Sequence, residues 1–165
     1  MSVTTAPLSI TRTLRSPDET AHLAQRLGAR LGAGDVLLLD GPIGAGKTHF
    51  ARALIQSRLA DAGRAEDVPS PTFTLVQTYF AGPLEIWHAD LYRLSHPDDV
   101  LELGLAEAFE TALCLVEWPD RLGDLAPPGA LHLTFAHGAA EETRVLTLSA
   151  TDPRWAPLLA EVAHE

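Results

Sequence analysis

Residues 36–48 constrain the fold of this chain more than any other stretch. They read VLLLDGPIGAGKT, an unbroken apolar run followed by a glycine-rich turn, and residues 50–55 then suit a helix. This is the phosphate-binding loop pattern G-x-x-x-x-G-K-T between a strand and a helix. Glycines let successive backbone N–H groups point into one cavity, and the helix N-terminus adds positive potential. The sequence therefore predicts a phosphate site at residues 41–48.

The lysine of this loop stands out in the composition. The chain has twelve Lys and Arg side chains, and Lys47 is the only lysine among them. A compact ammonium on a flexible stem fits between phosphates in a narrow loop, where a planar guanidinium is too wide. We expect Lys47 to reach the β- and γ-phosphates and the Thr48 hydroxyl to ligate Mg²⁺. The alternative is a chance glycine-rich turn, which the correct flanking segments disfavour.

Length and composition narrow the class of protein. The chain has 165 residues, 46% of them hydrophobic, so we expect one domain spanning residues 1–165. Apolar runs stay well below the ~20 residues that a membrane span needs, and the N-terminus does not resemble a signal peptide. Cys114 is the one cysteine and lies in an apolar run, which predicts a buried thiol and a reducing, cytoplasmic location.

The charge balance bears on the partners. The formal net charge of −10 should repel a nucleic-acid backbone over most of the surface. We therefore expect no DNA binding, no membrane association, and contact with tRNA only indirectly, through other proteins. A basic partner protein and a local arginine patch both stay open.

Hydrophobic patterns divide the chain into alternating strands and helices. Strands are expected at residues 8–14, 36–40, 73–80, 84–89, 113–116, 130–135 and 144–149. Helices are expected from residue 17 to the glycines at 32–34, from 47 to about 62, from 96 to beyond 109, and from 153 onward. The third helix should bury Val100, Leu101, Leu103, Leu105 and Phe109. This order predicts an α/β fold, a P-loop NTPase-like three-layer sandwich with a mixed, mainly parallel central sheet.

Two acids end strands that could flank the phosphate loop. Glu117 follows four apolar residues, which is the Walker B pattern, and Asp90 ends the less uniform strand at 84–89. A carboxylate there can hold Mg²⁺ or orient the attacking water. For either acid the alternative is a solvated residue at a strand end.

Polar residues elsewhere are weaker candidates. The hydroxyls of residues 70–74 (SPTFT) lie between the loop helix and the next strand, where a threonine can sense the γ-phosphate, but an ordinary Ser/Thr turn fits equally well. His88 alone is more typical of a packed strand residue than of a catalyst. His49 follows the loop, just inside the helix, and we expect it to be exposed.

Four blocks together resemble one family. They are GPIGAGKT at residues 41–48, SPTFTLV at 70–76, HADLYRL at 88–94 and CLVEWP at 114–119. In this order they resemble the TsaE (YjeE) family, small bacterial ATPases of tRNA threonylcarbamoyladenosine synthesis. The resemblance covers nearly the whole chain, and the last three blocks make it specific.

The resemblance implies a function and a set of site residues. It implies a Mg²⁺-dependent ATPase, slow alone and stimulated by its partners TsaD and TsaB, which resets that transferase complex between turnovers without transferring the threonylcarbamoyl group. The implied catalytic residues are Lys47, Asp90 and Glu117, and the implied metal ligands are Thr48, Glu117 and Asp90. The implied nucleotide-binding residues are Gly41, Gly44, Ala45, Gly46, Lys47, Thr48, His49, Thr72, Thr74, Trp118 and Arg144.

Two features depart from the family pattern, the dipeptide after Gly41 and the residue after Thr48. The family loop usually reads Gly-Asp-Leu-Gly, whereas Pro42 and Ile43 stand here, and Pro42 lacks an N–H. His49 replaces a second threonine. Either change could alter nucleotide affinity, but neither touches Gly46, Lys47 or Thr48.

Two other functions compete with the ATPase switch. A small-molecule kinase would need a mobile lid with several arginines, and the arginines here are scattered along the chain. A non-catalytic nucleotide-binding module would not need Lys47, Thr48, Asp90 and Glu117 together. We find no N-K-x-D motif that would indicate GTP.

Overall fold

The computed structural model describes residues 8–64, 68–69, 75–94, 96 and 98–163. Its strands are β1 (Leu8–Leu14), β2 (Val36–Asp40), β3 (Val76–Ala81), β4 (Leu84–Asp90), β5 (Leu113–Glu117), β6 (Leu131–His137) and β7 (Arg144–Ala150). Its α-helices are α1 (Pro17–Gly28), α2 (Lys47–Asp61), α3 (Asp98–Leu103), α4 (Leu105–Thr111) and α5 (Ala156–Ala163). Two 3₁₀ segments are η1 (Pro119–Leu125) and η2 (Pro153–Trp155). Among the described residues, none of the helices is long and apolar enough to cross a membrane.

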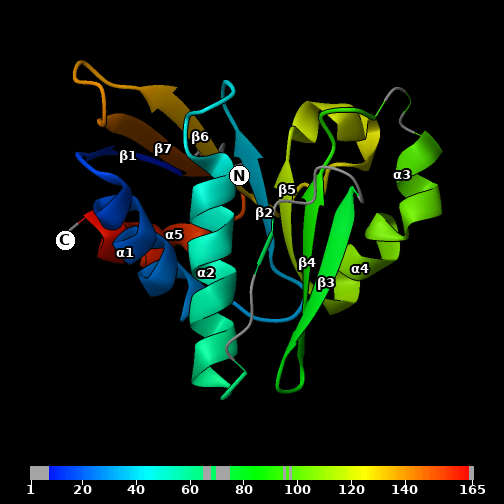
Figure 1. Cartoon of the computed structure of the whole chain (residues 1–165). Helices are drawn as coiled ribbons and strands as arrows, with labels where there is room; N and C mark the ends of the chain where they lie inside the picture. The colour runs from blue at the N-terminus through cyan, green and yellow to red at the C-terminus, as the bar shows by residue number, and fades with distance from the viewer. Residues whose placement is uncertain (1–7, 65–67, 70–74, 95, 97, 164–165) are drawn as a thin grey trace, which may run out of the picture.

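All the strands belong to one seven-stranded sheet in the order β1-β7-β6-β2-β5-β4-β3 (Figure 1). The central strands β6, β2, β5 and β4 run parallel to their neighbours within this group. The outer pairs β1–β7, β7–β6 and β4–β3 are antiparallel. The prediction of an α/β fold with a mixed sheet, mostly parallel at its centre, is confirmed.

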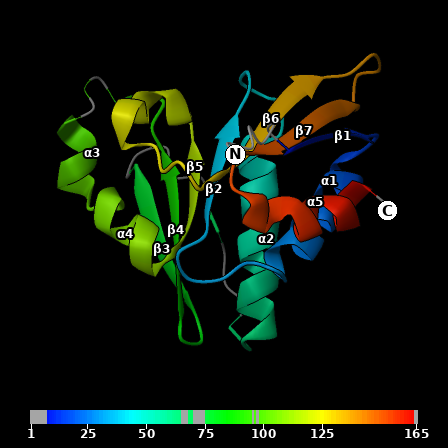
Figure 2. The ribbon, with the colours of Figure 1, turned by 180° about the vertical axis from the view of Figure 1, so that it is seen from behind.

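The loop strand β2 is buried on both faces, as its unbroken apolar run predicts. Because side chains alternate along a strand, Leu37 and Leu39 enter one hydrophobic cluster, which includes residues of α1, α2 and α5. Val36 and Leu38 enter a second cluster, which includes residues of α3 and α4. Helices therefore pack on both faces of the sheet, and Figure 2 shows the same layers from behind.

The first helix begins as predicted and ends earlier. The Ser16 side chain accepts a hydrogen bond from the Glu19 N–H, and Pro17 occupies the first turn, so α1 has a well-formed N-cap. The helix ends at Gly28, before the glycines at 32–34. Beyond it, the N–H groups of Arg30 and Leu31 bond to carbonyls three residues back, which tightens the chain into turns.

The single helix expected from residue 96 is wrong. Gly104 adopts a φ of +81° in the left-handed region, which L-residues with a Cβ disfavour, and it separates α3 from α4. The change of direction leaves Leu101 56% exposed, against the prediction that it is buried. Val100, Leu105 and Phe109 are buried as expected.

Two antiparallel strand pairs form from strands that the sequence predicts. Gly82, with φ +63°, lies between the antiparallel strands β3 and β4. Strand β3 is described from Val76; the expected beginning of this strand at residues 73 and 74 lies outside the described residues. Strands β6 and β7 pair antiparallel over residues 132–137 and 144–149.

Candidate nucleotide-binding site

The loop between β2 and α2 has the backbone that its glycines allow. Gly41, Gly44 and Gly46 all have positive φ, at +139°, +80° and +106°. A Cβ on Gly41 would lie 2.4 Å from the carbonyl oxygen of Phe135, so the loop can pack against β6 only with glycine at this position. The conformation of this loop therefore depends on glycine in two ways: glycine allows the positive φ angles, and it lets residue 41 lie against the Phe135 carbonyl.

The N-terminus of α2 opens into this loop. Within the described part of the chain, no side chain caps this helix end, and its first turn contains no acidic residue. The first N–H groups of a helix have no partner within the helix, and they concentrate positive potential at its end. An uncapped helix end beside a glycine-rich loop is suited to an anion such as a phosphate.

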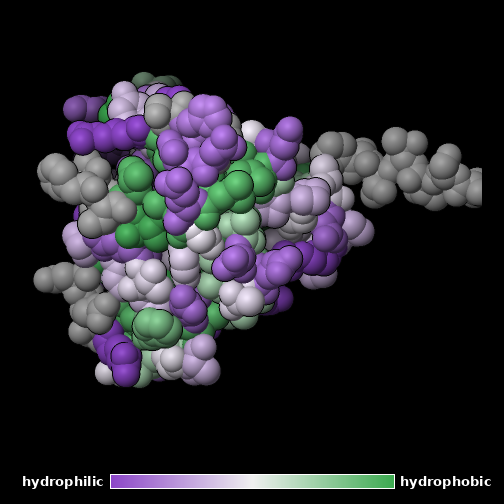
Figure 3. Space-filling model, turned by 90° about the vertical axis from the view of Figure 1, so that its right-hand side faces the viewer, coloured by the Kyte–Doolittle hydropathy of each residue, from purple (hydrophilic) through white to green (hydrophobic). Residues whose placement is uncertain are grey.

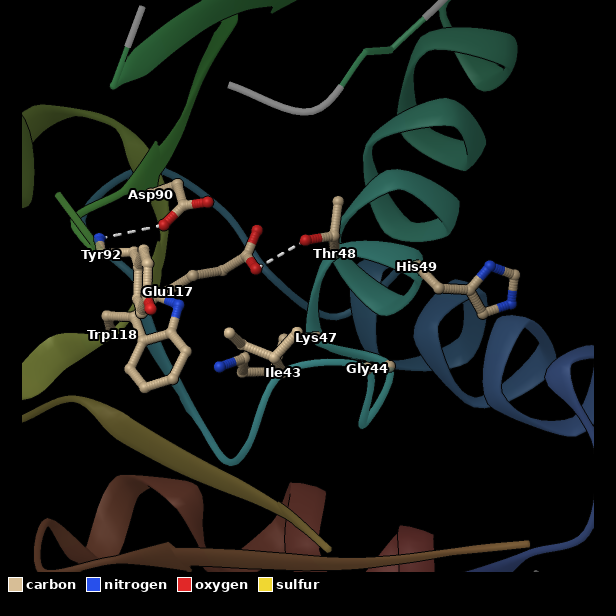
Figure 4. Close-up of a pocket in the computed structure, with 10 residues that line it drawn as sticks. Ile43, Gly44, Lys47, Thr48, His49, Asp90, Tyr92, Glu117 and Trp118 are labelled. Carbon is tan, nitrogen blue, oxygen red and sulfur yellow. Dashed lines mark hydrogen bonds between the residues drawn. The ribbon is translucent and has the colours of Figure 1, made fainter. Parts of the chain in front are cut away.

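A pocket of about 400 Å³ lies against this helix end (Figure 4). Residues of the loop, of the first turn of α2 and of the ends of β4 and β5 line it. The lining residues are Ile43, Gly44, Gly46, Lys47, Thr48, His49, Asp90, Tyr92, Glu117 and Trp118.

Glu117 meets the helix at the bottom of this pocket. It ends β5, which lies beside β2 in the parallel sheet, with Glu117 opposite Leu39. The Thr48 hydroxyl donates a hydrogen bond of 2.6 Å to Glu117 Oε1, as drawn in Figure 4. The Glu117 side chain is almost completely buried. The structure therefore brings together two of the predicted metal ligands from α2 and β5.

His88 holds the other oxygen of the same carboxylate. Its Nε2 lies 2.7 Å from Glu117 Oε2, and both side chains are buried. From the sequence, His88 is interpreted as a packed strand residue, and this contact is not predicted. The signal available was its spacing from Asp90: two residues apart on a strand, the two side chains share one face.

Asp90 lies next to Glu117. The two residues are register partners at the ends of the parallel strands β4 and β5. Asp90 Oδ1 accepts a hydrogen bond of 3.1 Å from the backbone N–H of Tyr92. Burial raises the pKa of Asp90, the Tyr92 hydrogen bond opposes this rise, and the negative charge of Glu117 adds to it.

Lys47 is folded back within the pocket. It is 4% exposed, and its Nζ donates a hydrogen bond of 2.5 Å to the carbonyl oxygen of Gly41. The same Nζ lies 3.4 Å from the ring centroid of Trp118, a cation–π contact. Burial lowers the pKa of Lys47, and the nearby carboxylates of Glu117 and Asp40 oppose that shift.

Trp118 occupies a restricted backbone conformation. Its φ of +59° is in the left-handed region, which is uncommon for a bulky residue. Its ring packs against Tyr92, with centroids 4.9 Å apart. The ring therefore forms an aromatic wall of the pocket, with Lys47 against it.

The remaining predicted residues lie at or beyond the edge of the pocket. His49 is exposed as expected; its ring approaches the carbonyl oxygen of Pro17 at 2.9 Å and points away from Glu117 in Figure 4. Ala45 is buried below the loop. Arg144 does not line the described pocket; it donates a 3.3 Å hydrogen bond to the Gly44 carbonyl. Thr72 and Thr74 lie outside the described residues.

The oxygen atoms here can serve as part of a magnesium site. Thr48, Glu117 and Asp90 offer only oxygen donors, the type that this hard cation prefers. Across the residues that the structure describes, no group of three or more His, Cys, Asp or Glu side chains could hold a metal ion. In proteins Mg²⁺ is usually bound by one or two carboxylates together with phosphate oxygens.

The sheet, the glycine loop and the uncapped α2 define a P-loop fold of the kind found in nucleoside triphosphatases. Comparison with solved structures agrees. YdiB of Bacillus subtilis superposes with a TM-score of 0.76 and 28% sequence identity, covering 98% of this chain and 97% of that chain.

Sequence comparison identifies the family. Residues 14–146 match the family described as "Threonylcarbamoyl adenosine biosynthesis protein TsaE". The tRNA threonylcarbamoyladenosine biosynthesis protein TsaE of Rickettsia conorii is 43% identical over 123 residues, which cover 74% of this chain and 69% of that protein. Its namesake in Bacillus subtilis is 34% identical over 150 residues, which cover 90% of each. The chain belongs to the TsaE family, as its motifs predict.

Proposed function

We propose that this protein binds ATP with Mg²⁺ in the pocket at the N-terminus of α2 and hydrolyses it, as an accessory protein of tRNA threonylcarbamoyladenosine synthesis. The observation that carries this proposal is the Thr48–Glu117 hydrogen bond beside an uncapped helix end. It joins the loop hydroxyl to the strand-end carboxylate at the place where phosphates would lie. The part of the proposal that concerns tRNA modification rests on the names of the related proteins.

The loop and helix end would bind the phosphates. The N–H groups of the first turn of α2 would donate to the phosphate oxygens, and Gly44 and Gly46 allow close approach of the backbone. Lys47 would leave Gly41 and Trp118 and turn its ammonium toward the β- and γ-phosphates. Nucleotide binding would therefore break the contacts of the Lys47 ammonium with Trp118 and with the Gly41 carbonyl.

Three oxygen-bearing side chains would hold the cation. The Thr48 hydroxyl and the Glu117 carboxylate already face one another, and Asp90 lies beside Glu117 in the sheet. A bound Mg²⁺ would neutralise charge on the phosphates and polarise the bond to be broken. Either Asp90 or Glu117 would also orient the attacking water. The partly buried carboxyl of Asp90, which has a raised pKa, suits such a contact.

A switch fits the pocket better than a kinase does. In the part of the chain that the structure describes, no arginine lines the pocket, whereas a kinase needs arginines around the transferred phosphoryl group. We therefore infer slow turnover by the protein alone and faster turnover with TsaD and TsaB, whose complex it would reset. Pro42 and His49 are both exposed and would tune affinity, and Thr72 or Thr74 would sense the γ-phosphate.

A protein partner has exposed apolar side chains to contact near the pocket. Ile43 is 69% exposed and Tyr92 is 46% exposed, and both line the pocket. Figure 3 shows one side of the molecule, where hydrophilic surface is interrupted by hydrophobic areas. With a net charge of −10, the protein would reach tRNA only through its partners. We place this single-domain protein in the cytoplasm, which suits its free, buried Cys114.

The test is ATP turnover with and without TsaD and TsaB, measured as phosphate release without an added acceptor. Lys47→Ala and Glu117→Ala should abolish the activity, whereas Arg64→Ala, which removes an exposed cation beyond α2, should not. Normal turnover by both site variants would overturn the site assignment. Phosphorylation of a metabolite in place of phosphate release would favour a kinase, and binding without turnover would favour a non-catalytic module.

A further inference from the structure

His88 is unusual among the buried polar groups of the protein. Its side chain is fully buried, and one nitrogen, Nε2, contacts Glu117. The other nitrogen, Nδ1, is the single buried side-chain nitrogen or oxygen without a hydrogen-bond partner among the described residues. Burying a polar atom without a partner costs free energy. A histidine that satisfies only one of its nitrogens is therefore a costly choice for packing alone.

The sheet sets the relation between His88 and Glu117. Strands β4 and β5 are parallel neighbours, with His88 opposite Leu115 and Asp90 opposite Glu117. Side chains at alternate positions share a face, so His88, Asp90 and Glu117 all lie on the face that packs against α2. His88 thus approaches Glu117 along the sheet, from deeper in the protein than the pocket.

The two oxygens of Glu117 have different partners. Thr48 Oγ1 lies 2.6 Å from Oε1, at the pocket, and His88 Nε2 lies 2.7 Å from Oε2, in the interior. An ionised carboxylate can only accept hydrogen bonds, so Nε2 carries the proton of this contact. In the neutral ring, Nδ1 is then the unprotonated nitrogen.

We propose that His88 is a positioning residue that fixes the Glu117 carboxylate for the metal–nucleotide complex. This rests on the proposed function. A bound cation would take the Thr48 hydroxyl, which keeps its proton, and Glu117 Oε1 as ligands, so the hydrogen bond between them would be lost, whereas the His88 contact to Oε2 would not. His88 therefore keeps Oε1 turned toward the pocket in both states. A ligand carboxylate held in this way by a neighbouring donor binds a metal more tightly than one free to rotate.

The chain offers a matched pair of variants at this position. In His88→Gln, the amide nitrogen lies as many bonds from Cβ as Nε2 does, so it can still donate to Oε2. In His88→Asn, the amide nitrogen falls at the position of Nδ1 and cannot reach Glu117. Ile86→Val, a buried change two residues away on the same face, controls for general loosening of β4.

The experiment measures the affinity for a non-hydrolysable ATP analogue with Mg²⁺ and with EDTA. In the wild type, Ile86→Val and His88→Gln, Mg²⁺ should strengthen binding. In His88→Asn, this Mg²⁺-dependent gain should fall by about 10- to 100-fold while metal-free affinity stays at the wild-type value. Full retention of the gain in His88→Asn overturns the role of His88. So does an equal loss with and without Mg²⁺, which a purely structural role predicts. Absence of Mg²⁺-dependent binding in the wild type overturns the proposed function as well.

A measurement on the wild type stands even if His88→Asn does not fold. In ¹⁵N-labelled protein, the Nε2–H proton of His88 should give a slowly exchanging, downfield resonance, because it is buried and bonded to a carboxylate. The resonance should persist when Mg²⁺ and the analogue are added. Its loss on loading, or protonation of Nδ1 in place of Nε2, would overturn the proposal.

Discussion

Thr48 and Glu117 are separated by 69 residues in the chain, yet their side chains form a hydrogen bond of 2.6 Å. Strands β2 and β5 make this possible, because they are parallel neighbours and both point toward the N-terminus of α2. The same contact places a hydroxyl and a carboxylate where a phosphate-bound cation would need them.

Glu117→Gln should separate binding from turnover. The amide oxygen can still accept the Thr48 hydrogen bond, and the amide NH₂ can donate to His88 Nε2 once the ring carries its proton on Nδ1. The fold should therefore persist, but the negative charge is lost. We expect turnover to fall on the order of 10²-fold, while the ATP analogue still binds. Single-turnover kinetics and equilibrium binding measure the two effects. The control is Glu110→Gln, an exposed change on α4, which should leave both turnover and binding at the wild-type values. Equal turnover in Glu117→Gln and Glu110→Gln would contradict the role of Glu117.

Lys47→Arg should fail to replace the only lysine. The Lys47 side chain is buried between Gly41 and Trp118, and a guanidinium is too wide for this space. We expect a loss of turnover on the order of 10²-fold, similar to that of Lys47→Ala. Phosphate release with both partners present is the measurement. Substantial activity in Lys47→Arg would show that charge alone suffices.

Trp118 should report nucleotide binding. Its ring contacts the Lys47 ammonium at 3.4 Å, and the proposed movement of Lys47 to the phosphates removes that contact. We expect a saturable change in tryptophan emission on adding the ATP analogue with Mg²⁺. Trp118→Phe should abolish the change although Trp87 and Trp155 remain. A signal that survives in Trp118→Phe would place the responding tryptophan elsewhere.

Two loop glycines should differ in their effect on stability. Gly44→Ala forces a side chain into the left-handed region with open space around it, which costs about 1 kcal/mol. Gly41→Ala also drives a Cβ against the Phe135 carbonyl, so it should cost about 3 kcal/mol. Urea unfolding measures both values. Equal losses would show that the loop can move away from β6.

Cys114 should make stability fall at alkaline pH. Burial raises the pKa of its thiol from 9.0 to about 12, so between these values the unfolded chain loses a proton that the folded protein keeps. The free energy of unfolding should then fall by about 1.4 kcal/mol per pH unit relative to Cys114→Ala. Urea unfolding of both proteins between pH 9 and 11 tests this. Parallel curves would mean that the thiol ionises in the folded state.

Local patterns predicted most of the elements and the centre of the site. The apolar run of β2, the glycines after it and the lysine that opens α2 are adjacent in the chain, so short-range rules suffice for them. The prediction of one helix from residue 96 is wrong because an apolar spacing that favours a helix is interrupted by a glycine that ends it. The apolar spacing continues across Gly104 and predicts one helix, whereas the left-handed backbone of Gly104 splits that helix and leaves Leu101 exposed.

The sequence by itself determined the class of fold, the phosphate loop and the candidate acids Asp90 and Glu117, because each depends on residues close together in the chain. Only the tertiary structure decided which side chains meet. The order of strands in the sheet brings His88 and Thr48 to opposite oxygens of Glu117, and it places Lys47 against Trp118. Strand order reflects how the two helical layers pack, so local periodicity does not encode it.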